Sequence, residues 1–167
     1  VPKTLTVISA RLNYFPKKEN TLQILQDKNK AYISRYTLGR DYHKVIRGKL
    51  KKLTKKLKEE VKNISFNSRV FTDTAPVLEV ELAEKAGLGW RGKHSLLLNK
   101  DNGSWFFLGE IYTSLPLVVD KKELNHCGSC SACIDVCPTR AIIAPYKLDA
   151  SKCISYLTIE FKGSIPL

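Results

Sequence analysis

The stretch His126-Cys127-Gly128-Ser129-Cys130-Ser131-Ala132-Cys133-Ile134-Asp135-Val136-Cys137-Pro138 has the spacing C-x2-C-x2-C-x3-C-P. Three thiolates at such short intervals can bind one face of a cubane cluster. The fourth, placed before a proline, serves the other cluster in two-cluster ferredoxins. The spacing therefore predicts that Cys127, Cys130, Cys133 and Cys137 are ligands of 4Fe–4S clusters.

Zinc and disulfide bonds are the alternative roles for these cysteines. Zinc sites use C-x2-C pairs too, but usually as two separated pairs. A disulfide framework is disfavoured because the number of cysteines, five, is odd, because they crowd into the last quarter of the chain, and because no secretory segment precedes them. A lone cysteine is usually core filling, but Cys153 follows the motif after a polar turn and is a candidate ligand.

The number of cysteines leaves both predicted clusters incomplete. Each 4Fe–4S cluster takes four thiolates. The set Cys127, Cys130 and Cys133 is one ligand short, and the pair Cys137 and Cys153 is two short. Either a partner supplies the others or the protein continues beyond this chain, and we favour continuation. The abrupt start before the first predicted strand suggests that the amino terminus is clipped as well.

Length, composition and charge define the class of protein. The 167 residues suffice for one sizeable core and a small appended module. A hydrophobic fraction of 43% is ordinary for a globular protein, and no apolar run is long enough to cross a bilayer, so we expect a cytoplasmic protein. The net charge of +12 indicates an acidic partner, with nucleic acid the leading candidate. A merely soluble basic surface is an equal alternative.

The first sixty residues predict a strand, a loop and a helix. Residues 5–14 are β-rich and predict a buried strand, and residues 16–30 predict a mobile surface loop. A helix is expected over residues 42–62, with Asp41 as its cap. One face of it carries an apolar stripe: Ile46, Leu50, Leu53, Leu57 and Val61. The other carries eight cations: Lys44, Arg47, Lys49, Lys51, Lys52, Lys55, Lys56 and Lys58. Such a face is usually only solvated, but its single sign favours nucleic-acid binding.

Asp73 ends the next predicted strand and precedes a helix predicted over residues 77–85, which Pro76 opens and Gly87 ends. An acid in this place is either catalytic or a plain helix cap. The glycine-rich, basic turn over residues 88–95 has no phosphate-loop spacing.

The segments that follow are shorter. Residues 100–103, Lys-Asp-Asn-Gly, predict a hairpin between strands at 96–99 and 105–109, whose aromatic residues we assign to the core. Residues 116–124 are the expected boundary before the cysteine module, and residues 139–143 are expected to form a short helix or turn.

Six stretches, in order along nearly the whole chain, resemble the epoxyqueuosine reductase family. They are residues 33–44 (ISRYTLGRDYHK), 73–79 (DTAPVLE), 86–94 (AGLGWRGKH), 106–112 (FFLGEIY), 126–139 (HCGSCSACIDVCPT) and 148–160 (LDASKCISYLTIE). That family is cobalamin-dependent, carries two 4Fe–4S clusters and is related to corrinoid reductive dehalogenases. It removes the epoxide oxygen of epoxyqueuosine in tRNA, the last step of queuosine synthesis.

The resemblance implies an α+β fold with two parts. Residues 1–120 would form a sandwich-like cobalamin-binding domain of nitroreductase or reductive-dehalogenase type, and residues 121–167 an incomplete ferredoxin-like module. Asp73 lies where the family places its proton donor. Ser155 is expected where cluster and corrin approach each other. Segments that shape the cobalamin pocket would supply Tyr36, Asp41, Tyr42, His43, and Gly92 and Lys93 of the 89–95 turn.

The chain departs from the family by lacking a downstream C-x2-C-x3-C-P motif, whose cysteines would complete both clusters. We therefore expect this chain alone to hold clusters poorly and to be inactive. The implied partners are a queuosine-type tRNA anticodon stem-loop and an electron donor, with the protein a monomer. A stand-alone iron–sulfur electron-transfer or RNA-binding module is one alternative. A reductive dehalogenase-like enzyme is another, against which the basic charge argues.

Overall fold

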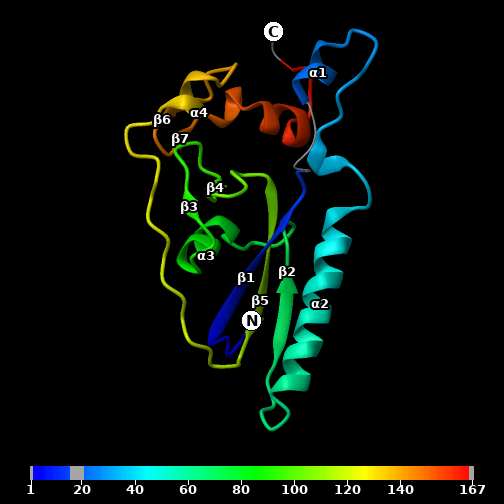
Figure 1. Cartoon of the computed structure of the whole chain (residues 1–167), viewed down its shortest axis with the longest axis vertical. Coiled ribbons are helices and arrows are strands. Elements are labelled where there is room, and N and C mark those ends of the chain that lie inside the picture. The colour runs from blue at the N-terminus through cyan, green and yellow to red at the C-terminus, as the bar shows by residue number, and fades with distance from the viewer. Residues whose placement is uncertain (1, 16–20, 166–167) are drawn as a thin grey trace.

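The computed structural model describes residues 2–15 and 21–165, and a three-stranded antiparallel sheet lies at its centre. The strand order is β1 (Thr6–Asn13), β5 (Phe106–Thr113) and β2 (Ser68–Phe71). Helix α2 (Tyr42–Glu60) covers one face and α3 (Glu79–Lys85) lies on the other (Figure 1). The structure thus has the mixed α and β composition that the sequence predicts.

Two short ribbons and several short helices complete the described part of the chain. β3 (Trp90–Arg91) pairs with β4 (Leu97–Leu98), and β6 (Ile142–Ala144) pairs with β7 (Lys147–Leu148). The helical segments are α1 (Thr21–Gln26), η1 (Arg35–Thr37), α4 (Ala132–Asp135), η2 (Ala150–Lys152) and η3 (Tyr156–Glu160). None of the described helices combines the length and apolar character needed to cross a bilayer.

Strand β5 contributes to two apolar cores because successive side chains of a strand point to opposite faces. Ile111 is fully buried against Ile46 and Leu50 of α2, whereas Phe106 packs with Ala83 of α3. Burying an aliphatic or aromatic side chain of this size contributes about 1.5–3 kcal/mol. The two helices are therefore held in place through one strand.

Helix α2 begins where the sequence predicts, because the Asp41 side chain accepts a hydrogen bond from the His43 N–H at 3.0 Å. Its apolar stripe differs from the prediction in one turn. Leu53 is 39% exposed, and Thr54 occupies the next buried position after Leu50. The Thr54 hydroxyl donates to the Leu50 carbonyl at 3.0 Å, which removes the cost of burying it.

Two other helix predictions need correction. Part of the predicted 16–30 loop, Thr21–Gln26, is the helix α1, a segment free of helix-breaking glycine and proline, while residues 16–20 lie outside the described residues. Helix α3 begins at Glu79 rather than at residue 77. The N–H groups of Thr74, Ala75 and Val77 each donate to the carbonyl two residues earlier, so this segment forms tight turns instead of a helical turn. Its end is as predicted, with Gly87 in the left-handed region at φ 71°.

Three predictions about the later strands also fail in part. Asn99 and Gly103 exchange backbone hydrogen bonds as the hairpin predicts, but β4 pairs with β3, and β5 pairs with β1 and β2. Trp105, assigned to the core, is 46% exposed. Residues 139–143 are predicted to form a helix or turn, but Ile142 and Ile143 belong to β6, consistent with the strand preference of two adjacent isoleucines.

The close approach of β5 to α2 at Gly109 gives a test of this packing. A Cβ atom there would lie 2.8 Å from Ile46 Cγ2 and 3.0 Å from Leu50 Cδ1. We expect Gly109→Ala to lower the free energy of unfolding by about 1–3 kcal/mol through overpacking, measured by urea denaturation.

Gly48→Ala on α2 is the matched control, because a Cβ there meets nothing within 4 Å. It should raise the free energy of unfolding by about 0.5–1 kcal/mol, since alanine loses less backbone entropy in a helix. Equal effects of the two substitutions would contradict the described packing.

Candidate active site

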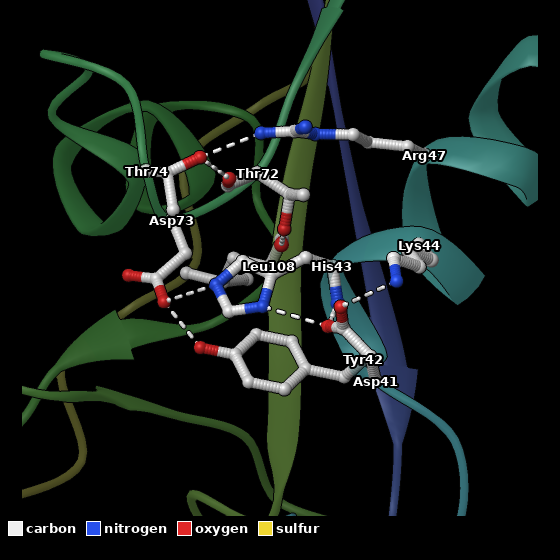
Figure 2. Close-up of polar contacts among 9 residues, drawn as sticks. All are labelled: Asp41, Tyr42, His43, Lys44, Arg47, Thr72, Asp73, Thr74 and Leu108. Atoms are coloured by element: carbon white, nitrogen blue, oxygen red, sulfur yellow. Dashed lines mark hydrogen bonds and ion pairs between the residues drawn. The ribbon is translucent and has the colours of Figure 1, made fainter.

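Asp73, Tyr42 and His43 form a polar cluster where the end of β2 meets the start of α2 (Figure 2). The Tyr42 hydroxyl donates to Asp73 Oδ2, and His43 Nε2 lies 3.0 Å from the same oxygen. Both rings meet Oδ2, and Oδ1 points away from them (Figure 2). The Asp73 side chain is 54% exposed, so a second molecule can reach it.

His43 is held between two carboxyl groups. Its Nδ1 lies 2.9 Å from Asp41 Oδ1, the oxygen that also accepts the His43 N–H. Hydrogen bonding to the His43 side chain is the largest cause that lowers the pKa of the Asp41 carboxyl. Asp41 therefore both caps α2 and orients the imidazole toward Asp73.

Aromatic stacking fixes the ring of Tyr42. It stacks on Phe107 of β5, with ring centroids 4.2 Å apart and planes 4° from parallel, and on His43 at 4.0 Å. Burial, followed by the hydrogen bond to Asp73, raises the pKa of the Tyr42 hydroxyl well above its ordinary value. Tyr42 thus remains a hydrogen-bond donor to Asp73 at any physiological pH.

The backbone of Asp73 is held by contacts on both sides. The preceding residue, Thr72, is buried and donates to the Leu108 carbonyl of β5 at 2.9 Å. Asp73 adopts φ 52°, which is uncommon for a non-glycine residue. Its N–H donates to Glu79 Oε1 at 2.6 Å. Leu78, not Asp73, is the cap residue of α3, so the plain N-cap role considered for Asp73 is wrong.

Tyr36 lies beside this cluster. It lines a cavity of about 480 Å³ together with Tyr14, Tyr42 and Phe107. The 3-10 turn η1 presents Tyr36, which is 39% exposed. The structure therefore brings Tyr36, Asp41, Tyr42, His43 and Asp73 together, although they come from three separate segments.

Gly92, Lys93 and Ser155 lie elsewhere in this structure. Gly92 packs tightly in the β3–β4 turn, where a Cβ would come within 2.7 Å of Leu98 Cδ1. Lys93 Nζ donates to the carbonyls of Gly128 and Cys130 in the cysteine loop, both at 2.7 Å. Ser155 is exposed at the start of η3. Within the described residues, no hydrogen bond joins these three to the Asp73 cluster.

In the described part of the chain, N–H groups donate to the sulfur atoms of two cysteines. Cys127 Sγ accepts from Trp90 Nε1 at 3.4 Å, and Cys137 Sγ accepts from the Ala141 N–H at 3.3 Å. The backbone N–H of Ile142, then that of Ala141, lowers the pKa of the Cys137 thiol. Donors aimed at sulfur stabilise the thiolate, the form that binds metal.

The five thiols are free, with Cys130 exposed and the others half-buried. Among the residues that the structure describes, no three His, Cys, Asp or Glu side chains lie close enough together to hold a single metal ion. The described cysteines thus show donor-supported thiolate positions but no assembled ion site.

Sequence reasoning assigned no role to two acids next to the cluster, Glu79 and Glu110. Glu79 opens α3 and reaches back to Asp73, and Glu110 is fully buried in the middle of β5. The sequence does contain one indication of Glu110: it is an acid inside an otherwise apolar strand-like run, Phe106-Phe-Leu-Gly-Glu-Ile-Tyr112. Nothing in the local sequence shows that Glu79 meets Asp73.

Two family models match the chain. Residues 1–74 match the family described as "Epoxyqueuosine reductase QueG, DUF1730". Residues 126–167 match the "4Fe-4S double cluster binding domain".

Comparison with individual proteins agrees with these matches. The chain is 58% identical to epoxyqueuosine reductase of Vibrio cholerae over 100% of its length, and 53% identical to that of Escherichia coli over 99%. It covers 45% and 43% of those proteins, so it spans less than half of the curated relatives it matches.

Solved structures give the same result for the fold. A crystal structure of epoxyqueuosine reductase with an epoxyqueuosine-modified tRNA-Tyr stem loop superposes with a TM-score of 0.81 at 31% identity, over 99% of this chain and 43% of that one. The structure from Streptococcus thermophilus gives 0.82 at 30%, over 99% and 44%. In sequence and in fold, therefore, the whole chain matches the epoxyqueuosine reductase family.

Proposed function

We propose that the protein containing this chain reduces epoxyqueuosine in tRNA to queuosine. The observation that carries the proposal is the 53–59% identity to epoxyqueuosine reductases along essentially the full chain. We further propose that residues 1–120 form the corrinoid-binding domain, with the sandwich-like fold of related reductases, and residues 121–167 the iron–sulfur module. The protein would act as a cytoplasmic monomer with a separate electron donor.

The residues present fit the implied cofactors. The N–H donors to Cys127 and Cys137 suit thiolate ligands of an iron–sulfur cluster. Cys130, Cys133 and Cys153 would be the other ligands from this chain. The aromatic cavity beside Asp73 suits the flat apolar face of a corrin, which Tyr36, Tyr42 and His43 would contact. We retain Asp41, Gly92, Lys93 and Ser155 as residues that shape the cofactor sites.

When bound, the corrinoid and the clusters would supply the two electrons that removal of the epoxide oxygen requires. The remaining requirement is protons, because the oxygen leaves as water. Asp73 would donate a proton to that oxygen through Oδ1, the carboxyl oxygen that points away from the Tyr42 and His43 rings (Figure 2). His43, within 3.0 Å of Oδ2, is placed to return a proton to Asp73.

The basic face of α2 would bind the RNA backbone. Its eight cations are all exposed, and among the described residues two of them form ion pairs with acids on or next to the helix, Lys44 with Asp41 and Lys55 with Glu59. Such contacts give affinity by releasing counterions from phosphates. The helix starts at the Asp73 cluster, so RNA lying along it would place a nucleoside near that carboxyl.

Asp73→Asn tests the proton donor. The amide keeps the shape of the side chain but has no acidic proton, so we expect kcat to fall by about 100-fold or more, with the cobalamin absorption spectrum unchanged. The measurement is queuosine formed in epoxyqueuosine-containing tRNA by the full-length, cofactor-loaded protein. Asp101→Asn, at an exposed position of the 100–103 turn, should have wild-type turnover. Equal turnover of both variants would rule out the donor role.

Cys137→Ser tests cluster ligation. In full-length protein purified without air, we expect the iron content to drop by one cluster, about 4 iron atoms per chain, because a serine hydroxyl is a poor replacement for a thiolate ligand. Iron and acid-labile sulfide are measured. Ser129→Ala, in the same loop, is the control and should retain the wild-type content. Full iron content in Cys137→Ser would remove this residue from the ligand set.

Lys51→Gln tests the RNA surface. Loss of one phosphate contact should reduce the slope of log Kd against log salt concentration by about 0.7–0.9. Binding of a tRNA stem-loop is measured at several salt concentrations by fluorescence anisotropy. Lys121→Gln, an exposed lysine between β5 and α4, should leave the slope unchanged. Identical slopes for both variants would exclude the α2 face at this position.

A further inference from the structure

Glu110 is an acid with no exposed surface and no hydrogen-bond donor. It lies in the central strand β5 at 0% exposure, and neither of its carboxyl oxygens has a hydrogen-bond partner among the described residues. Its cross-strand neighbours are Ser9 of β1 and Phe71 of β2. The Ser9 hydroxyl is also buried without a partner. An isolated carboxylate in such a place would be costly, so the group must be neutralised.

Glu79 of α3 is the neighbouring acid whose charge and side chain act on the pKa of Glu110. Two carboxyl groups can form a hydrogen bond only if one of them carries a proton. Burial, followed by the neighbouring charge of Glu79, raises the pKa of Glu110 to about 8, and burial also raises the pKa of Glu79. One proton shared between the two acids satisfies both at neutral pH.

The surrounding charges do not replace that proton. Tyr112 of β5 senses the charge of Glu110, and Asp73 and His43 act on Glu79 from the other side. Asp73 raises the pKa of Glu79 and His43 lowers it. Arg11 of β1 is two positions from Ser9, and its buried Nη1 forms no hydrogen bond with either acid.

We propose that Glu79 and Glu110 share one proton and act as a latch that positions Asp73. The shared proton joins the carboxyl of Glu79 to β5. Glu79 Oε1 then holds the Asp73 N–H at 2.6 Å, which keeps Asp73 in its left-handed conformation. Both acids are positioning residues, because they act on the reaction through Asp73. The effect of these two acids on turnover rests on the proposed function, but the hydrogen bonds of the latch do not.

Loss of the shared proton opens the latch. Above about pH 8 both acids are charged and repel each other in a buried site, so Glu79 moves and the Asp73 N–H is released. The same titration affects stability. The pKa of Glu110 is raised in the folded state, so stability falls as pH rises from about 4.5, its ordinary pKa, to about 8.

Hydrogen exchange of the full-length protein tests the latch directly. Protection of the backbone amides of residues 73–78 is measured by mass spectrometry at pH 7 and pH 9, in peptides that begin upstream of Phe71 so that the Asp73 amide is retained, each corrected for the exchange rate of the unstructured peptide. We expect the wild-type protein to be protected at pH 7 and to lose that protection at pH 9.

Three variants and one control separate the latch from general stability. Glu110→Gln donates an N–H to Glu79 at every pH, so protection should persist at pH 9, and the decline of the thermal unfolding midpoint between pH 5 and 8 should become smaller. Glu110→Met has similar length but no donor, so protection should be lost at both pH values. Glu79→Gln still accepts from the Asp73 N–H and should stay protected. Glu81→Gln, on the same helix with a side chain that is 44% exposed, should behave as wild type.

Turnover gives a second readout. Glu110→Met should lower kcat by up to about 100-fold, the cost of misplacing a reacting group by about 1 Å. Glu110→Gln should have the kcat of the wild-type protein at pH 7. It should also lack the fall in kcat that we expect of the wild-type protein above about pH 8. Equal protection of wild type, Glu110→Gln and Glu110→Met at both pH values would overturn the latch. If amide protection changes with pH as expected but the Asp73→Asn protein is fully active, only the proposed role of Asp73 is overturned, and the latch stands.

Discussion

Pairing of β5 with both β1 and β2 is the constraint on which the rest of the structure depends. Backbone hydrogen bonds on both edges fix β5, and its side chains then anchor α2 on one face and α3 on the other. Asp73 follows β2 directly, while His43 sits in the first turn of α2. Because both elements pack on β5, a carboxyl and an imidazole thirty residues apart meet within 3.0 Å.

The same strand carries an acid into the interior. Phe107 on the α2 face supports the ring of Tyr42, and on the opposite face the charge of Glu79 contributes to raising the pKa of Glu110. Asp73 is thus held from both faces of the sheet, through its side chain by Tyr42 and through its backbone by Glu79. An exposed carboxyl can keep a fixed position in this way without being buried itself.

The cysteine segment is joined to this body through the β3–β4 ribbon. Trp90 donates to the sulfur of Cys127, and Lys93 donates to two carbonyls of the cysteine loop. The match of residues 126–167 to a double-cluster domain agrees with the cysteine spacing. Lys93, which the family resemblance assigns to the cobalamin pocket, contacts the cysteine loop in this structure.

The sequence by itself determined the features that depend on local patterns: the cysteine spacing, the helix that starts after Asp41, the left-handed Gly87 and the basic face of α2. These follow from short-range geometry and side-chain chemistry. Only the tertiary structure decided that β5 lies between β1 and β2 instead of pairing with residues 97–98, and that Glu79 both accepts from the Asp73 N–H and acts on the pKa of Glu110. Strand order and contacts between distant residues depend on how whole faces pack, which no local pattern encodes.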